Sequence, residues 1–267
     1  MLSYYPRQTA TIPSIFTGVD KIEYTPEGIE QAQATFNEKA LYQAIATFAQ
    51  EWYKKNQRVA KVLDLCSATG LCAWQVAQAI PVDEVTLVDI DRKYLEVGVK
   101  HFEEVSPVLC FCEDAVYFNK QQTYDLILMN SAYHHIENGK KVAFLKNARN
   151  LLANGGEILI GDNFLPKSST GNRDEFRQSV VLFYTHLLKE LQKRNEPSEA
   201  INVIRKAAFN CWQGIEEYKV SFPVFKNHAI QSNLSIQKVN QVWIAEENKQ
   251  NYACGVWGSF AASICSI

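Results

Sequence analysis

The feature that most constrains the fold is an alternation of short apolar runs and helical stretches in the middle of the chain. The apolar runs occupy residues 59–65, 84–90, 107–112, 124–130 and 156–161. Helical spacing predicts helices over 70–80, 91–104 and 138–153, whereas 113–123 shows no clear helix. Continuous apolar strands separated by helices are typical of a parallel sheet that is covered on both faces. The sequence therefore predicts an α/β protein with a doubly wound sheet.

The segments that flank this alternation predict helical additions and a terminal hairpin. A helical stretch begins at Thr25 as N-cap, with Pro26 at the first helical position. Beyond residue 162, helices are predicted near 173–194 and 197–212 and at FPVFKNHAIQS, and the last two strands form an antiparallel pair. We therefore expect a mostly parallel sheet of seven strands. It divides the chain into an N-terminal helical lid at 1–57, a sheet domain at 58–163 and 222–267, and a helical cap insert at 164–221.

Composition excludes several classes of function. The 267 residues are 47% hydrophobic and carry a net charge of -2 without a basic run, so no nucleic-acid partner is expected. No stretch approaches the length of a membrane helix, and the first residues do not read as a signal peptide. The seven cysteines are scattered and include no CxxC pair, so we expect a cytoplasmic protein with reduced cysteines and no metal. A homodimer is compatible with these features.

The turn DLCSATG, which follows the first strand, indicates which ligand the sheet can bind. Open parallel sheets bind ligands beyond the carboxyl ends of their strands. A dinucleotide turn would need glycine at Cys66, Ala68 and Leu71, and the phosphate loop GxxxxGK[ST] is absent, so a phosphate ligand is not expected. Asp64 ends the first strand and can meet a cationic amino group near the turn.

Two more acids end the next two strands. Asp89 closes the second strand, where a carboxylate can accept hydrogen bonds from two ribose hydroxyls, and Asp114 follows the third strand and can address an adenine amine. Any one of these acids is as readily explained as a helix cap. Three acids at three successive strand ends favour one crevice that binds a nucleoside with a cationic tail.

These residues resemble the motifs of class I S-adenosylmethionine-dependent methyltransferases, a Rossmann-like family. The family turn D-x-G-x-G-x-G is matched by Asp64, Cys66, Ala68 and Gly70, and the segments YDLILMNSAYHHI and LLANGGEILIGDNF resemble its fourth and fifth strands. The resemblance covers residues 58–163 well and 222–263 loosely. It implies that S-adenosylmethionine is the cofactor, with the binding residues Asp64, Cys66, Ser67, Ala68, Gly70, Asp89, Ile90, Asp114, Ala115 and Asn130.

The catalytic candidates follow the fourth strand and end the fifth. His134 has a side chain suited to act as a general base near neutral pH. Tyr133 is a candidate to face the sulfonium with its ring, and Asp162 to orient the acceptor. For His135 the favoured interpretation is packing with a bond to the backbone, although it remains a candidate for contact with substrate.

Aromatic residues outside the sheet domain predict a cap over a small organic substrate. The substrate and cap candidates are Tyr5, Tyr24, His135, Tyr184 and Trp212. Lys219 is interpreted as a solvated surface residue, with pairing to an acidic substrate as the alternative.

The predicted function is methylation of an oxygen or nitrogen on a small molecule. A second hypothesis is attack at the aminocarboxypropyl carbon of the same cofactor, by group transfer or by cyclisation, which would release methylthioadenosine. The third is a binding protein that retains the fold without turnover, because fold does not fix function.

Overall fold

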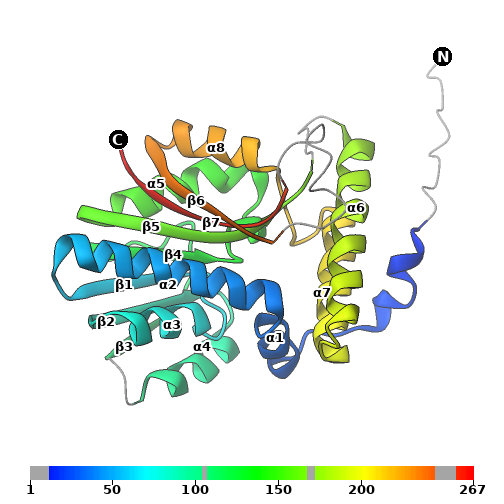
Figure 1. Cartoon of the computed structure of the whole chain (residues 1–267), viewed down its shortest axis with the longest axis horizontal. Coiled ribbons are helices and arrows are strands. Elements are labelled where there is room, and N and C mark those ends of the chain that lie inside the picture. The colour runs from blue at the N-terminus through cyan, green and yellow to red at the C-terminus, as the bar shows by residue number, and fades with distance from the viewer. Residues whose placement is uncertain (1–11, 104–106, 167–171, 244–256) are drawn as a thin grey trace.

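The computed structural model describes residues 12–103, 107–166, 172–243 and 257–267. A twisted sheet is flanked by helices on both faces, and a pair of long helices lies beyond one end of its strands (Figure 1). The sheet has seven strands in the order β3-β2-β1-β4-β5-β7-β6. Strands β1 to β5 are parallel, and β7 runs antiparallel to both β5 and β6. The predicted α/β class with its mostly parallel sheet and terminal hairpin is confirmed.

The strands follow the predicted apolar runs closely. They are β1 Ala60–Leu65, β2 Val82–Asp89, β3 Val108–Cys112, β4 Tyr124–Asn130, β5 Leu152–Phe164, β6 Leu234–Trp243 and β7 Gly258–Ser266. Because side chains alternate along a strand, each central strand contributes side chains to two apolar cores, one on each face of the sheet. Leu63 and Leu65 pack toward one face of the sheet, whereas Val62 packs toward the other.

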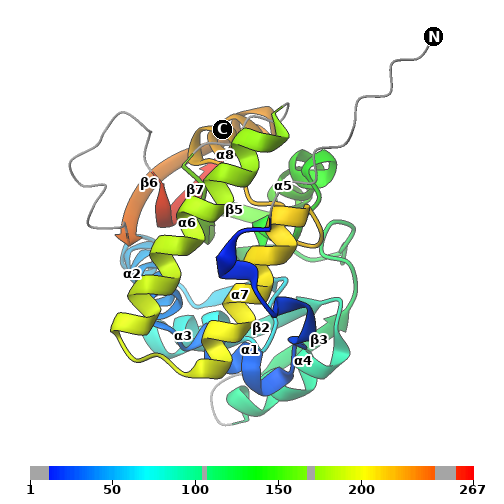
Figure 2. The same cartoon turned by 90° about the vertical axis from the view of Figure 1, so that its right-hand side faces the viewer.

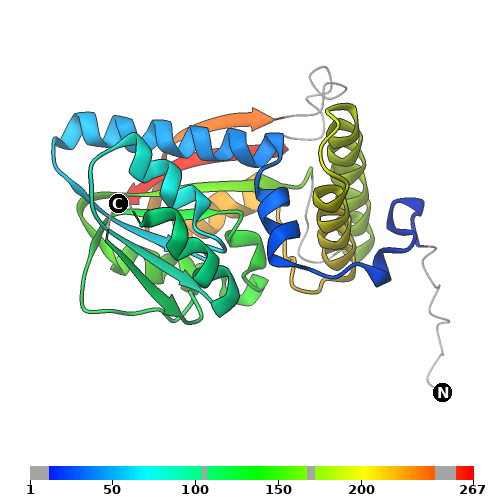
Figure 3. The same cartoon turned by 90° about the horizontal axis from the view of Figure 1, so that it is seen from below.

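The helices form three groups. They are α1 Pro26–Gln33, α2 Phe36–Asn56, α3 Leu71–Ala79, α4 Arg92–Gly98, α5 Lys141–Asn150, α6 Arg173–Lys193, α7 Ser198–Gln213 and α8 Phe222–Gln231. Helices α2, α3 and α4 cover one face of the sheet, and α5 and α8 cover the other. The antiparallel pair α6 and α7 stands apart from both faces, and α1 lies between this pair and the sheet (Figure 3).

Viewed from the end of the sheet, α6 and α7 lie across the carboxyl ends of the strands (Figure 2). Their own apolar core joins Phe183, Leu187 and Trp212 to Phe16 and to Trp257 of the C-terminal segment. None of the helices in the described ranges combines the length and the hydrophobicity that crossing a bilayer requires.

Three predicted boundaries are wrong for physical reasons. The stretch that begins at Pro26 is two helices, because the chain is extended at Thr35. Helix α4 ends at Gly98 and continues only as a short 3₁₀ turn. Gly155 and Gly156 do not end a helix but lie inside β5, where a Cβ on Gly156 would come within 2.8 Å of the Asp125 carbonyl oxygen. That close approach of two strands requires glycine.

Candidate functional site

The turn after β1 keeps a left-handed backbone without the usual glycines. Cys66 has φ 57°, Ala68 has φ 45° and Gly70 has φ 70°. A side chain in this region costs roughly 1–2 kcal/mol per residue. Hydrogen bonds to β2 stabilise this strained backbone. The Ser67 amide donates to the Val88 carbonyl at 3.0 Å, and the Ala68 amide donates to Asp89 Oδ2 at 2.8 Å. The turn therefore follows a glycine-like path with larger residues.

Three buried polar atoms beside this turn have no hydrogen-bond partner among the described residues. They are Asp64 Oδ2, Ser67 Oγ and Asn130 Oδ1. Burial raises the pKa of Asp64 to about 8, and the charge of Asp89 adds to the rise. Native proteins rarely leave such atoms unpaired, because each one costs about 1–3 kcal/mol. Their common place at the carboxyl ends of the adjacent strands β1 and β4 indicates a site for a polar ligand.

The two other strand-end acids bind backbone amides. Asp89 accepts from the amides of Ala68 and Asp91, and Asp114 Oδ1 accepts from the Val116 amide at 2.9 Å. The capping alternative does not hold for these two acids, because Asp91 is the N-cap of α4 and the structure describes no helix between β3 and β4. Each carboxylate also has lone pairs for further donors. Ile90 is 77% exposed directly after Asp89, as an apolar surface next to the turn. Ala115, the neighbour of Asp114, is buried.

His134 and Asp162 form a buried pair at the ends of β4 and β5. His134 Nδ1 lies 2.7 Å from Asp162 Oδ1, and the Asp162 carboxylate also accepts from the amides of His134 and Asn163. Burial raises the pKa of Asp162, but the imidazole of His134 and the ammonium of Lys219 outweigh it and hold that pKa below its ordinary value. Burial lowers the pKa of His134 to about 4. A neutral His134 donates from Nδ1 to Asp162 and presents a lone pair on Nε2.

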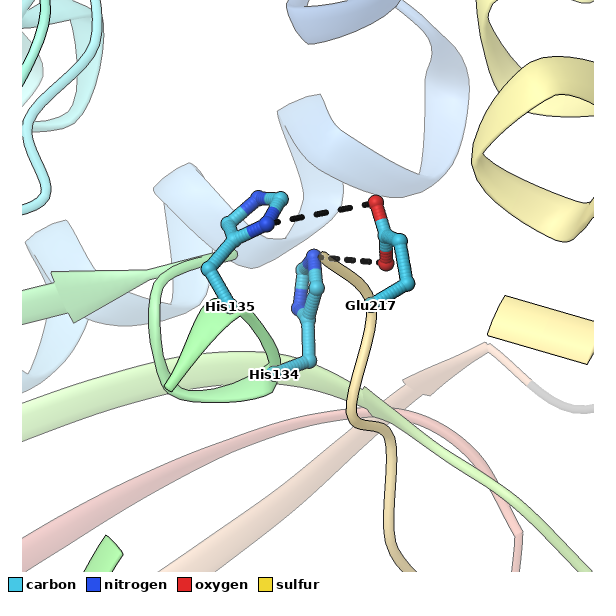
Figure 4. Close-up of side chains that lie close together, drawn as sticks. All are labelled: His134, His135 and Glu217. Atoms are coloured by element: carbon cyan, nitrogen blue, oxygen red, sulfur yellow. Dashed lines mark ion pairs between the residues drawn. The ribbon is translucent and has the colours of Figure 1, made fainter. Parts of the chain in front are cut away.

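The Nε2 atom of His134 faces Glu217, a residue from the loop after α7 (Figure 4). Nε2 lies 3.4 Å from Glu217 Oε2, and His135 Nδ1 lies 4.0 Å from Glu217 Oε1. Lys219 Nζ is 3.5 Å from the same Oε2. The predicted surface position of Lys219 is wrong, since its side chain is only 3% exposed. His135 is half-exposed instead of packed, although Nδ1 does approach a backbone carbonyl, that of Glu216, at 3.1 Å.

Glu38, in the first turn of α2, connects the N-terminal helices to the same edge of the sheet. Its carboxylate accepts from Ser131 Oγ at 2.7 Å, Asn130 Nδ2 at 3.1 Å and Asn163 Nδ2 at 3.3 Å. Burial is the main reason why the pKa of Glu38 is raised, and these donors oppose it. Sequence reasoning missed this residue, and an acid ahead of the apolar face of a helix is the only signal that the sequence offers.

The structure corrects the aromatic candidates. The Tyr133 ring lies in the core against Phe225, and its hydroxyl is 2.6 Å from His228 Nδ1, so it does not face the strand-end crevice. Tyr184 and Trp212 are buried in the core of the helix pair. Burial raises the pKa of Tyr184 and the charges of Glu217 and Asp162 add to the rise, so its hydroxyl lies near the His134 corner. Trp212 also lines a cavity of about 580 Å³ whose lining includes none of the strand-end residues.

Of the remaining two cap candidates, Tyr24 and Tyr5, only Tyr24 lies within the described residues. Tyr24 is 37% exposed, and the charges of Glu217 and Glu216 act on it, so it lies near the His134 corner. Tyr5 falls outside the described residues.

Part of the chain is similar in sequence to known methyltransferases. The family model described as "Methyltransferase domain" matches residues 62–156. A Caenorhabditis elegans 2-methoxy-6-polyprenyl-1,4-benzoquinol methylase is 30% identical over 107 residues, which cover 38% of this chain and 37% of that protein. A Bacillus anthracis malonyl-[acyl-carrier protein] O-methyltransferase is 27% identical over 90 residues, or 34% of this chain. The chain thus matches only about a third of the length of these relatives.

Solved structures agree over nearly the whole chain. The plantazolicin methyltransferase BpumL, solved with a triazolic desmethylPZN analog and SAH, covers 95% of this chain and 93% of its own at a TM-score of 0.60 and 12% identity. An S-adenosylmethionine-dependent methyltransferase from Clostridium acetobutylicum covers 84% of this chain and 92% of its own at a TM-score of 0.55 and 13% identity. Residues 62–156 thus match a methyltransferase domain, and the whole chain shares the fold of solved S-adenosylmethionine-dependent methyltransferases.

Proposed function

We propose that the protein transfers a methyl group from S-adenosylmethionine to an oxygen or nitrogen of a small organic acceptor. The observation that carries the proposal is the set of unpartnered buried atoms at Asp64, Ser67 and Asn130, next to the His134–Asp162 pair. An ammonium and a carboxylate are the groups that such atoms would bind. The similar proteins named above are methyltransferases, which supports the same reaction.

The residues present fit the cofactor. Asp64 would ionise to hold its ammonium, Asn130 Oδ1 would accept a further hydrogen bond from that ammonium, and Ser67 Oγ would donate to its carboxylate. The lone pairs left on Asp89 suit two ribose hydroxyls, and Ile90, Asp114 and Ala115 would border the adenine. Cys66 and Ala68 keep the backbone of the turn close, in the path that Gly70 also takes. When bound, the sulfonium supplies an activated methyl carbon.

His134 is the residue we assign to activating the acceptor. Asp162 fixes its tautomer and directs the Nε2 lone pair away from the sheet. The acceptor would meet Nε2 beside Glu217, under the helices that lie across the strand ends. Glu38 and the short helix α1 would close the other side of the pocket, because Gln33 Oε1 already accepts from Thr69 Oγ1 of the turn at 2.6 Å.

Identification of the cofactor by-product tests the reaction. The protein is incubated with S-adenosylmethionine, with and without a panel of small phenols, carboxylic acids and amines, and products are followed by mass spectrometry. We expect S-adenosylhomocysteine that depends on an acceptor. Methylthioadenosine formed without an acceptor would replace this proposal by cofactor cyclisation, and cofactor binding without any product would support a binding protein.

A further inference from the structure

The corner formed by His134, His135 and Glu217 contains a contact that their charges do not explain. If His134 donates its Nδ1 proton to Asp162, the Nε2 lone pair points at a carboxylate only 3.4 Å away. Two acceptors that face each other in a buried site repel unless a cation lies between them. Glu217 Oε2 makes an ion pair with Lys219 Nζ at 3.5 Å, but it has no hydrogen-bond partner among the described residues and no cation on the side that faces His134 Nε2, although the side chain is only 5% exposed.

We propose that these three side chains bind a divalent transition-metal ion, through His134 Nε2, His135 Nδ1 and a carboxylate oxygen of Glu217. One ligand atom from each lies within 4.8 Å of the other two. In a tetrahedral site with bonds of about 2.1 Å, neighbouring ligand atoms are about 3.4 Å apart. The Nε2 to Oε2 distance already has that value, and the distances from His135 to the other two ligand atoms must contract by up to about 1.4 Å.

His135 is the ligand that would have to move to shorten these distances. His135 is half-exposed, whereas His134 and Glu217 are held by burial. To bind the ion, His135 must exchange its contact with the Glu216 carbonyl for the metal. His134 needs no such change, because Asp162 already takes its second nitrogen. A carboxylate behind a ligating histidine is the arrangement that orients imidazoles in metal sites.

The ligand set defines the class of ion and leaves room for a substrate. Two imidazoles and one carboxylate suit Zn²⁺ and neighbouring first-row ions over Mg²⁺ or Ca²⁺, which prefer oxygen ligands. Three protein ligands leave at least one position open. An acceptor hydroxyl bound there would lose its proton more easily, so the ion would replace Nε2 as the activating group. This part of the inference rests on the proposed function, whereas binding of the ion does not.

A metal titration without turnover tests the site. Cys110 and Cys112 are exposed thiols two positions apart on β3 and would bind the same ions, so the experiment uses a Cys110→Ser/Cys112→Ser parent. Chelator-treated protein is titrated with Co²⁺, followed by visible absorption, and with Zn²⁺ by calorimetry. We expect one ion per chain and a visible absorption band that is typical of Co²⁺ with a low coordination number.

Variants locate the ion. Glu217→Gln and His135→Ala should each weaken binding at least about 100-fold, and Asp162→Asn about 10–100-fold, the range for a residue that supports a ligand. His101→Ala is the matched control, because His101 Nε2 faces a single carboxylate, Glu30, at 3.5 Å, and it should bind like the parent. His135→Ala alters a half-exposed side chain and tests the idea even where a buried variant fails to fold.

Two results would overturn the site. One is absence of saturable Co²⁺ and Zn²⁺ binding. In that case the short contact would be explained by a proton shared between His134 Nε2 and the Glu217 carboxylate. The other is equal affinity in the parent and in His135→Ala and Glu217→Gln. Binding of S-adenosylhomocysteine, measured on the same samples, separates this outcome from failure of the proposed function, since the cofactor site does not include these ligands.

Discussion

The turn after β1 and the corner around His134 lie at the same edge of the sheet but are built in opposite ways. The turn comes from one continuous stretch, and its functional atoms on Asp64 and Ser67 are left without partners. In the corner, segments far apart in the sequence meet, and most polar atoms are paired within the protein. The difference indicates that a bound cofactor would supply the hydrogen-bond partners missing at the turn, whereas the corner is largely paired within the protein, with Glu217 Oε2 as the exception named above.

Removing the imidazole of the corner should give the largest effect. We expect His134→Ala to lower turnover by about 10²-fold or more, whether the group acts as a base or as a ligand. Affinity for S-adenosylhomocysteine, measured by calorimetry, should stay within about threefold, because the cofactor contacts lie at the turn. His101→Ala serves as the control. Unchanged turnover in His134→Ala would contradict the assignment of cofactor binding to the turn and catalysis to the corner.

Asp64→Asn should separate binding from stability at the turn. Loss of the carboxylate should weaken binding of S-adenosylhomocysteine by about 10-fold to 100-fold, as expected for 1–3 kcal/mol. The same change should stabilise the free protein at high pH. The folded pKa of Asp64, about 8, lies above its unfolded value, so the folded state holds a proton that the unfolded state releases, and stability falls as pH rises from about 4 to about 8.

Urea unfolding at pH 5 and pH 8 measures this second effect. Asp64→Asn should gain at least about 1 kcal/mol over the parent at pH 8 and less at pH 5. The control is Asp125→Asn, another buried strand aspartate, whose ion pair with Arg58 at 2.5 Å would be lost. It should be less stable than the parent at pH 8. A parent that loses no stability between the two pH values would contradict the argument.

The smallest effect concerns the strained backbone of the turn. At a positive φ, glycine removes roughly 1–2 kcal/mol of strain but adds about 0.4–1 kcal/mol of unfolded-chain entropy. We therefore expect Ala68→Gly to leave the free energy of unfolding unchanged or raise it by up to about 1.6 kcal/mol. Ala77→Gly, inside α3, should lower it by about 0.5–1 kcal/mol. Equal losses in both variants, measured by urea unfolding, would mean that the turn is not strained.

The two regions also differ in how much the sequence reveals. Asp64, Asp89 and Asp114 each end a strand, and the alternation of strands and helices brings consecutive strand ends together. Their placement is therefore predictable from local patterns. The same reasoning put His134 and Asp162 at this edge, and the structure brings them within 2.7 Å.

There is a physical reason why the rest of the corner could not be predicted from the sequence. Glu217 and Lys219 lie in an irregular loop that has no periodicity, so nothing in the sequence shows that both side chains are buried. They remain inside only because they meet the charges of distant residues. Glu38 is similar, since three of its four side-chain donors come from the end of β4, from Ser131 just after it and from β5, and only Asn37 is a neighbour in the sequence. Long-range charge pairing leaves no local pattern.

The order of the last strands has a consequence for how the chain folds. Strand β7 follows β6 in the sequence but lies between β5 and β6, and in the described residues β6 pairs only with β7. Strand β6 therefore has no place in the sheet until β7 has formed. Until then the edge of β5 has unpaired backbone groups, which can associate with another chain. We expect the hairpin to dock as a unit late in folding, after the slow closure of this long-range contact. The interval before docking is when a newly made chain is most exposed to aggregation.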